Sequence, residues 1–101
     1  MCGIIGIIYK NKTPNISEIL QMNNSIKHRG PDDSGVLNFE NVSLGHVRLS
    51  IQDLSDKGKQ PMSNDERYWI IYNGEIYNFK EIRENLSCWN YIFPSKNPLN
   101  L

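Results

Sequence analysis

The chain has 101 residues, and its eleven basic side chains are balanced by eleven acidic ones. This length allows one small domain with a modest core, and the neutral balance excludes nucleic acid and a membrane surface as expected partners. The two cysteines make no disulfide framework, the longest apolar run is too short to span a bilayer, and no signal peptide is recognisable, so we expect a cytoplasmic protein.

The first quarter of the chain predicts a strand followed by a helix. Residues 4–9 form a continuous apolar run, which is typical of a strand buried on both faces. Asn15 and Glu18 have the spacing of a capping box, so we expect a helix from there to about Lys27. The apolar positions predicted to share one helix face are Ile16, Ile19, Leu20 and Ile26.

A proline and two glycines in residues 28–35 predict an ordered loop, in which Asp32 and Asp33 cap backbone N–H groups. Residues 36–39 and 42–46 then read as two strands joined by a tight turn, with further extended chain over residues 47–51.

The second half carries weaker signals. Residues 53–66 are polar and predict a long surface loop, and residues 68–72 predict a strand that ends at Asn73-Gly74. Asn78 and Glu81 repeat the cap-like spacing ahead of a short helix over residues 79–86. Strands outnumber helices and are joined mostly by short turns, which favours an α+β architecture.

Cys2 is the first candidate for chemistry, because it follows the initiator Met1 directly. Removal of Met1 would leave a residue that carries both a thiol and a free α-amine. The amine can take the proton of the thiol, as in N-terminal threonine nucleophiles. Taken alone, however, Cys2 is more typical of a buried structural cysteine.

Other residues offer partners for such a nucleophile. The side-chain amide of Asn73 and the N–H of Gly74 are suitable donors to an oxyanion, although Asn-Gly is also a common turn. Arg48 is suited to bind a carboxylate, although its local sequence favours an exposed strand charge. His28 and His46 match no compact zinc pattern with the nearby aspartates, so no metal site is expected.

Five motifs occur together and in a fixed order. They are Cys2-Gly3-Ile4, His28-Arg29-Gly30-Pro31-Asp32, Gly45-His46-Val47-Arg48-Leu49-Ser50-Ile51, Gln60-Pro61-Met62 and Tyr72-Asn73-Gly74-Glu75-Ile76-Tyr77-Asn78. In this order they resemble the amino-terminal glutaminase domain of glutamine-hydrolysing asparagine synthetases, a class II glutamine amidotransferase domain. The resemblance implies part of the αββα sandwich of the N-terminal-nucleophile hydrolases, with a mainly antiparallel sheet and two short helices.

The resemblance also implies residue roles. Cys2 would attack the side-chain amide of glutamine, and Asn73 and Gly74 would form the oxyanion hole. Arg48 would bind the α-carboxylate of glutamine, and Glu75 would help to place its amino end. The pocket would be lined by Leu49, Ser50, Ile51 and Gln52. The family is often homodimeric, and its synthetase domain uses ATP and magnesium to amidate aspartate; no cofactor is expected in this chain.

The chain departs from the family pattern after Leu86. The family expects a strand and then a turn whose aspartate binds the substrate amino group, but the last aspartate here is Asp65. We therefore expect residues 1–86 to form a partial, truncated amidotransferase domain and residues 87–101 to form a poorly ordered tail. The synthetase domain and its ATP-binding signature are not found.

Two alternatives stay open at this stage. The chain could be an inactive remnant, or a segment that needs a partner to fold, since the expected aspartate is missing. It could also be a nucleophile hydrolase for another amide, which would not need the carboxylate clamp at Arg48.

Overall fold

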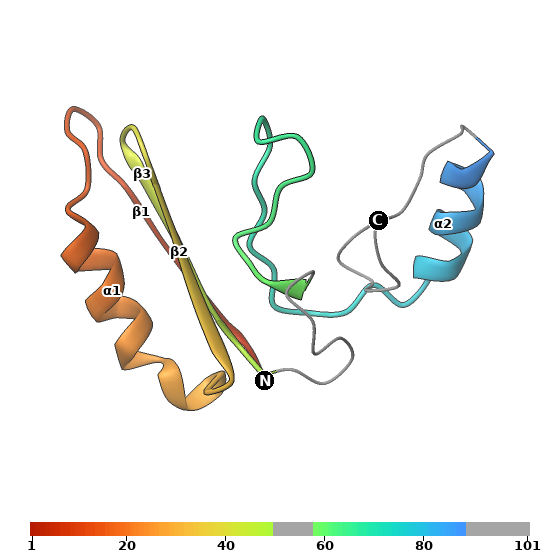
Figure 1. Ribbon diagram of the computed structural model, residues 1–101, viewed down its shortest axis with the longest axis horizontal. Helices are drawn as coiled ribbons and strands as arrows, with labels where there is room; N and C mark the ends of the chain where they lie inside the picture. The colour runs from red at the N-terminus through yellow and green to blue at the C-terminus, as the bar shows by residue number, and fades with distance from the viewer. Residues whose placement is uncertain (50–57, 89–101) are drawn as a thin grey trace.

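A computed structural model describes residues 1–49 and 58–88 (Figure 1). It has α+β architecture, as predicted: a three-stranded antiparallel sheet and two α-helices. In chain order the elements are β1 (Gly3–Ile8), α1 (Ile16–Ser25), the short 3-10 helix η1 (Lys27–Arg29), β2 (Asp33–Phe39), β3 (Val42–Arg48) and α2 (Phe79–Ser87). The strand order is β1-β3-β2, so β3 lies in the centre.

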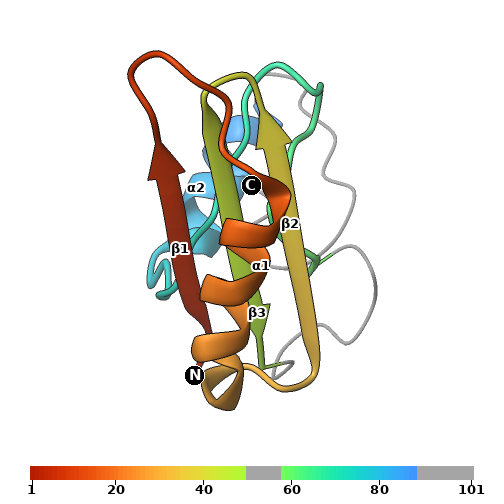
Figure 2. The same cartoon turned by 90° about the vertical axis from the view of Figure 1, so that its left-hand side faces the viewer.

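Helix α1 covers one face of this sheet (Figure 2). Ile19 and Val47 are fully buried and form the centre of the core. Small residues on β3 let the helix approach closely, because a Cβ atom at Gly45 would lie 2.5 Å from Oδ1 of Asn23. Packing of this kind rewards an exact match of side-chain sizes.

Strand β1 is not buried on both faces, which corrects the prediction from its apolar run. Its side chains alternate between half-buried and exposed, and Ile4 and Ile8 on the face away from α1 are 45% and 75% exposed. The continuous apolar run therefore did not separate a doubly buried strand from one with a single covered face.

The hairpin of β2 and β3 was predicted correctly, with its turn at Glu40 and Asn41. Glu40 adopts a positive φ of 53°, as one residue of a tight hairpin turn commonly must. The loop prediction for residues 28–35 was too long, because β2 already begins at Asp33. Its pairing with Arg48 extends the ladder and supplies the backbone partners that the local sequence did not reveal.

The start of α1 was also predicted correctly. Oδ1 of Asn15 accepts a hydrogen bond from the N–H of Ser17 at 3.1 Å, which caps the helix. The helix ends at Ser25, earlier than expected, and Ile16 and Leu20 are exposed. The buried stripe instead passes through Ile19 and Asn23, because the helix lies on the small residues of β3.

The segment 58–72 lies on the face of the sheet opposite α1 (Figure 1). No strand forms over residues 68–72; Met62 and Ile70 make only an isolated bridge, with two hydrogen bonds of 2.9 Å. The predicted surface loop is also partly wrong, since Gly58 and Gln60 are buried. Residues 50–57 of the predicted extended and loop segments lie outside the described residues.

Helix α2 forms where its apolar spacing predicted it, although the side chain of Asn78 makes no capping hydrogen bond. Ser87 belongs to this helix, and the rest of the predicted tail lies outside the described residues. Among the residues that the structure describes, no helix is long and apolar enough to cross a membrane.

Candidate active site

Cys2 lies just ahead of β1 and is held against the end of β3. The N–H of Leu49 donates to the Sγ atom of Cys2 at 3.4 Å, and the thiol faces the Leu49 carbonyl at 3.8 Å. On the other side, Nε of Arg29 donates to the backbone carbonyl of Cys2 at 3.0 Å. The thiol is half-buried and therefore accessible, while its backbone is fixed at both ends of the site.

The register of the sheet explains this placement. Gly3 of β1 pairs with Val47 of β3, so Cys2 and Arg48 each lie one residue beyond that pair at the same end of the sheet. The loop before β2 closes the other side, because the N–H of Asp32 donates to the carbonyl of Arg48 at 3.0 Å. Gly30 packs directly on the β3 backbone there, where a Cβ atom would collide with the Arg48 nitrogen.

Arg48 is only 7% exposed, which corrects the local expectation of an exposed strand charge. It ends the central strand, so β1 and β2 flank its backbone, and it pairs in register with Asp33. A buried guanidinium needs compensating partners, and this makes it suitable for gripping a carboxylate. Asp33 itself forms an ion pair with Lys59, with 3.8 Å between Oδ2 and Nζ.

The prediction that Asp32 and Asp33 cap the loop is confirmed for Asp33. Its Oδ1 atom accepts a hydrogen bond from the N–H of Ser34 at 2.9 Å.

His46 is a buried residue of this end of the sheet that the sequence had suggested only as a metal ligand. Its side chain is 1% exposed, and its Nε2 atom has no hydrogen-bond partner in the described part of the chain. Burial lowers the pKa of His46 below its ordinary value, against a hydrogen bond to the Tyr72 backbone that raises it; Arg48 lowers it further and Asp33 raises it. The alternation of Leu44, His46 and Arg48 along β3 was the signal that could have linked them.

The remaining predicted site residues are placed less directly. Asn73, Gly74 and Glu75 are exposed, and they follow Tyr72, which is tied to His46. Ser50, Ile51 and Gln52 lie outside the described residues. The structure thus brings Cys2, Arg48 and Leu49 to one end of the sheet, and the roles of the whole set stay predictions.

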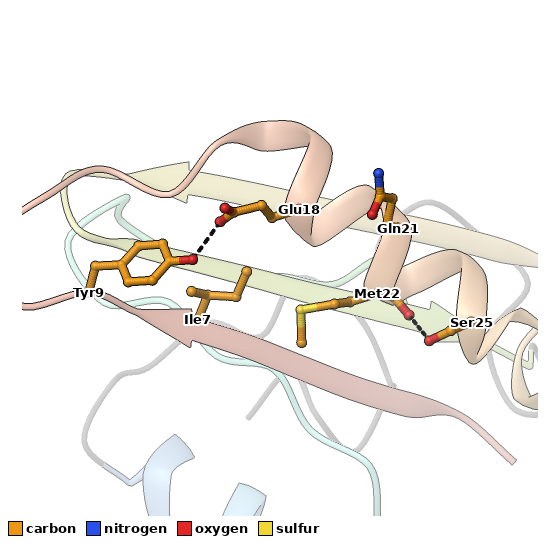
Figure 3. A pocket seen from close by; sticks show the side chains of 6 residues that line it. All are labelled: Ile7, Tyr9, Glu18, Gln21, Met22 and Ser25. Carbon is orange, nitrogen blue, oxygen red and sulfur yellow. Dashed lines mark hydrogen bonds between the residues drawn. The ribbon is translucent and has the colours of Figure 1, made fainter.

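No group of three or more histidine, cysteine, aspartate or glutamate side chains is arranged to hold a metal ion within residues 1–49 and 58–88. A separate open hollow of about 490 Å³ lies between α1 and β1 (Figure 3). It is lined by Ile7, Tyr9, Glu18, Gln21, Met22 and Ser25. Tyr9 donates to Oε2 of Glu18 at 2.9 Å across it. None of the motif residues lines this hollow, so it is distinct from the candidate site.

Comparisons with known proteins give the family. The family described as "Glutamine amidotransferase domain" matches residues 1–97. Asparagine synthetase (glutamine-hydrolyzing) 1 of Bacillus subtilis is 48% identical over 98 residues, covering 92% of this chain and 15% of that protein. A putative asparagine synthetase (glutamine-hydrolyzing) 2 of Methanocaldococcus jannaschii is 49% identical over 106 residues, covering 86% of this chain and 21% of the relative.

A plant protein is similar as well. Asparagine synthetase (glutamine-hydrolyzing) 3 of Arabidopsis thaliana is 40% identical over 94 residues, covering 90% of this chain and 16% of the relative. The chain thus spans between 15% and 21% of the length of these relatives. The match over residues 1–97, together with the α+β fold of a partial N-terminal-nucleophile hydrolase, shows that the chain belongs to the glutamine amidotransferase domain family.

Proposed function

We propose that this chain carries the glutamine-hydrolysing site of an asparagine synthetase, with Cys2 as the nucleophile. The observation that supports this most strongly is the hydrogen bond of 3.4 Å from the Leu49 N–H to Sγ of Cys2, next to buried Arg48. A nucleophile and a carboxylate-binding cation at one end of a sheet suit a substrate that carries both an amide and a carboxylate.

In the proposed reaction, removal of exposed Met1 frees the α-amine of Cys2. The amine takes the thiol proton as sulfur attacks the carbonyl carbon of the glutamine side-chain amide. Asn73 and Gly74 donate hydrogen bonds to the oxyanion that forms. The C–N bond then breaks, the proton passes to the leaving ammonia, and a γ-glutamyl thioester remains. Water hydrolyses the thioester to glutamate and restores the thiol.

Arg48 would bind the α-carboxylate of glutamine, with Glu75 near its amino end and residues 49–52 lining the pocket. We propose that the ammonia serves the synthetase activity that the names of the relatives carry, amidation of aspartate to asparagine with ATP and magnesium. That chemistry is assigned to no residue of this chain.

The test is covalent labelling with an electrophilic glutamine analogue, followed by mass spectrometry of the intact chain and its peptides. We expect loss of Met1 and a single label on Cys2, and no label in Cys2→Ser. Exposed Cys88 is the internal control for unspecific reaction of a thiol. Label on Cys88 alone would contradict the proposal.

A second measurement addresses the carboxylate clamp. Arg48→Met should need at least about tenfold more analogue for half-maximal labelling, because the charge-assisted hydrogen bonds to the carboxylate are lost. An otherwise identical reagent without the α-carboxylate should label both proteins equally slowly. If it labels wild type as fast as the amino acid analogue does, the substrate is another amide.

A further inference from the structure

Tyr72, the residue that precedes the Asn73-Gly74 turn, is held at two places. Its N–H donates to Oε1 of Gln60 at 2.6 Å, and its backbone also forms a hydrogen bond with the ring of His46. Both Gln60 and His46 are buried. Two buried side chains from separate segments therefore fix the path of a backbone that is otherwise irregular.

The anchors of Tyr72 are themselves fixed to the sheet. His46 belongs to β3, the central strand. The backbone of Gln60 lies directly on β2, because a Cβ atom at Gly35 would collide with the Gln60 carbonyl oxygen. The position of Tyr72 is thus set by the sheet and not by the exposed segment that follows it.

The side chain of Tyr72 extends this order toward the turn. A Cβ atom at Gly74 would lie 2.8 Å from the Tyr72 hydroxyl oxygen and 2.9 Å from the ring carbon beside it. The ring therefore packs on the backbone of Gly74. A displacement of Tyr72 would carry Gly74 with it.

His46 makes this arrangement at a cost. Its Nε2 atom is buried without a hydrogen-bond partner among the described residues, and leaving such a group unsatisfied destabilises a folded protein. Phenylalanine or leucine would fill the space without that cost. A pure packing role therefore does not explain a histidine here, whereas a hydrogen bond to Tyr72 does.

We propose that His46 is a positioning residue, which holds Tyr72 and thereby the Asn73-Gly74 turn at the end of the sheet where Cys2 lies. The role rests on the proposed function, in which this turn forms the oxyanion hole. Oxyanion donors act only when they are already aimed at the developing charge. Loss of His46 should therefore slow the chemical step and leave binding of the glutamine part unchanged.

The first experiment measures amide hydrogen exchange in the 101-residue chain. The Tyr72 N–H should be protected in wild type and exchange about tenfold faster in His46→Phe, since opening frees the bond to Gln60. Ser43→Ala is the matched control: it removes another buried hydrogen bond of β3, from Ser43 Oγ to Asn38 at 2.6 Å, on the face toward α1. Exchange at Tyr72 should be unchanged there, after correction for global stability.

His46→Asn is the conservative variant, and His46→Leu replaces the phenylalanine variant if the larger ring does not fit. Because Nε2 has no partner, Nδ1 makes the bond to Tyr72, and asparagine places an amide N–H near that position. We expect His46→Asn to restore protection. An unprotected Tyr72 N–H in wild type, equal exchange in wild type and the apolar variants, or no restoration by asparagine would each overturn the proposal.

The second experiment measures labelling of Cys2 at increasing concentrations of the glutamine analogue. His46→Phe should lower the maximal rate at least about tenfold with an unchanged half-saturating concentration, because only transition-state interactions are lost. An equal maximal rate in a labelled wild type would overturn the positioning role. An unlabelled wild type would instead contradict the proposed function, and the exchange experiment would still decide whether His46 holds Tyr72.

Discussion

The two faces of the central strand β3 are built from different side chains. Toward α1 it presents small or apolar residues, Ser43, Gly45 and Val47, all of which are buried. Toward the segment 58–72 it presents His46 and Arg48, which are buried as well. One strand therefore serves a packed core on one face and a polar cluster on the other.

The difference teaches where the cost of the site is borne. The face toward α1 gains stability from close packing and needs no particular chemistry. The opposite face buries a guanidinium and an imidazole, which destabilise the fold unless partners compensate for lost water. We infer that α1 and its face of the sheet supply the stability on which the polar face depends.

The largest effect should come from the packed face. Ile19→Ala should lower the free energy of unfolding by about 2–5 kcal/mol, because a fully buried side chain leaves a cavity. The neighbouring change Leu20→Ala removes a half-exposed side chain and should cost less than about 1 kcal/mol. Urea unfolding of both variants measures the difference, and equal losses would show that α1 does not pack through Ile19.

A glycine behind the site should rank second. Gly30→Ala forces a Cβ atom into the backbone of Val47 and Arg48, so we expect a loss of about 1–3 kcal/mol and slower labelling of Cys2. Gly6→Ala is the control, because its nearest atoms would be 3.7 Å away, which is ordinary contact. Thermal melts of the pair test this, and a neutral Gly30→Ala would refute the close approach of the loop.

The pH dependence of stability should report the polar face. Burial lowers the pKa of His46 below 6.5, so below that pH the unfolded chain binds a proton that the folded chain resists. Stability should therefore be fully present above pH 6.5 and fall as the solution is acidified through the folded-state pKa. Urea midpoints between about pH 7.5 and 5.5 measure this, before most carboxylates titrate.

The charges that face His46 are Arg48 and Asp33, and neither carries this dependence in the chosen range. The slope should flatten in His46→Asn. A slope that persists in that variant would assign the dependence to another group.

The smallest effect should come from the rim of the site. Lys59→Met breaks an ion pair with Asp33 in which the lysine side chain is 54% exposed, so the loss should be about 0–1 kcal/mol. Added salt should weaken the pair in wild type and leave the variant unaffected. A loss as large as that of Ile19→Ala would mean that this pair belongs to the core.

Local signals predicted the elements that depend on neighbours in the chain. The turn at Glu40 and Asn41, the cap at Asn15 and the apolar spacing of α2 each act within a few residues, and these elements form. The predictions for residues 33–35 and 68–72 were wrong, because pairing with a distant segment decides whether extended chain becomes a strand. Asp33 finds Arg48 as its partner, whereas residues near Ile70 form only one bridge.

By itself the sequence determined the family, since five motifs in order do not depend on knowing their positions in space. It also named Cys2, Arg48, Asn73 and Gly74 as the residues to follow. Only the tertiary structure decided that Arg48 is buried, that Leu49 meets the Cys2 thiol and that His46 reaches Tyr72. The reason is physical: burial and hydrogen bonding between residues far apart in sequence depend on strand register and on which face another segment covers.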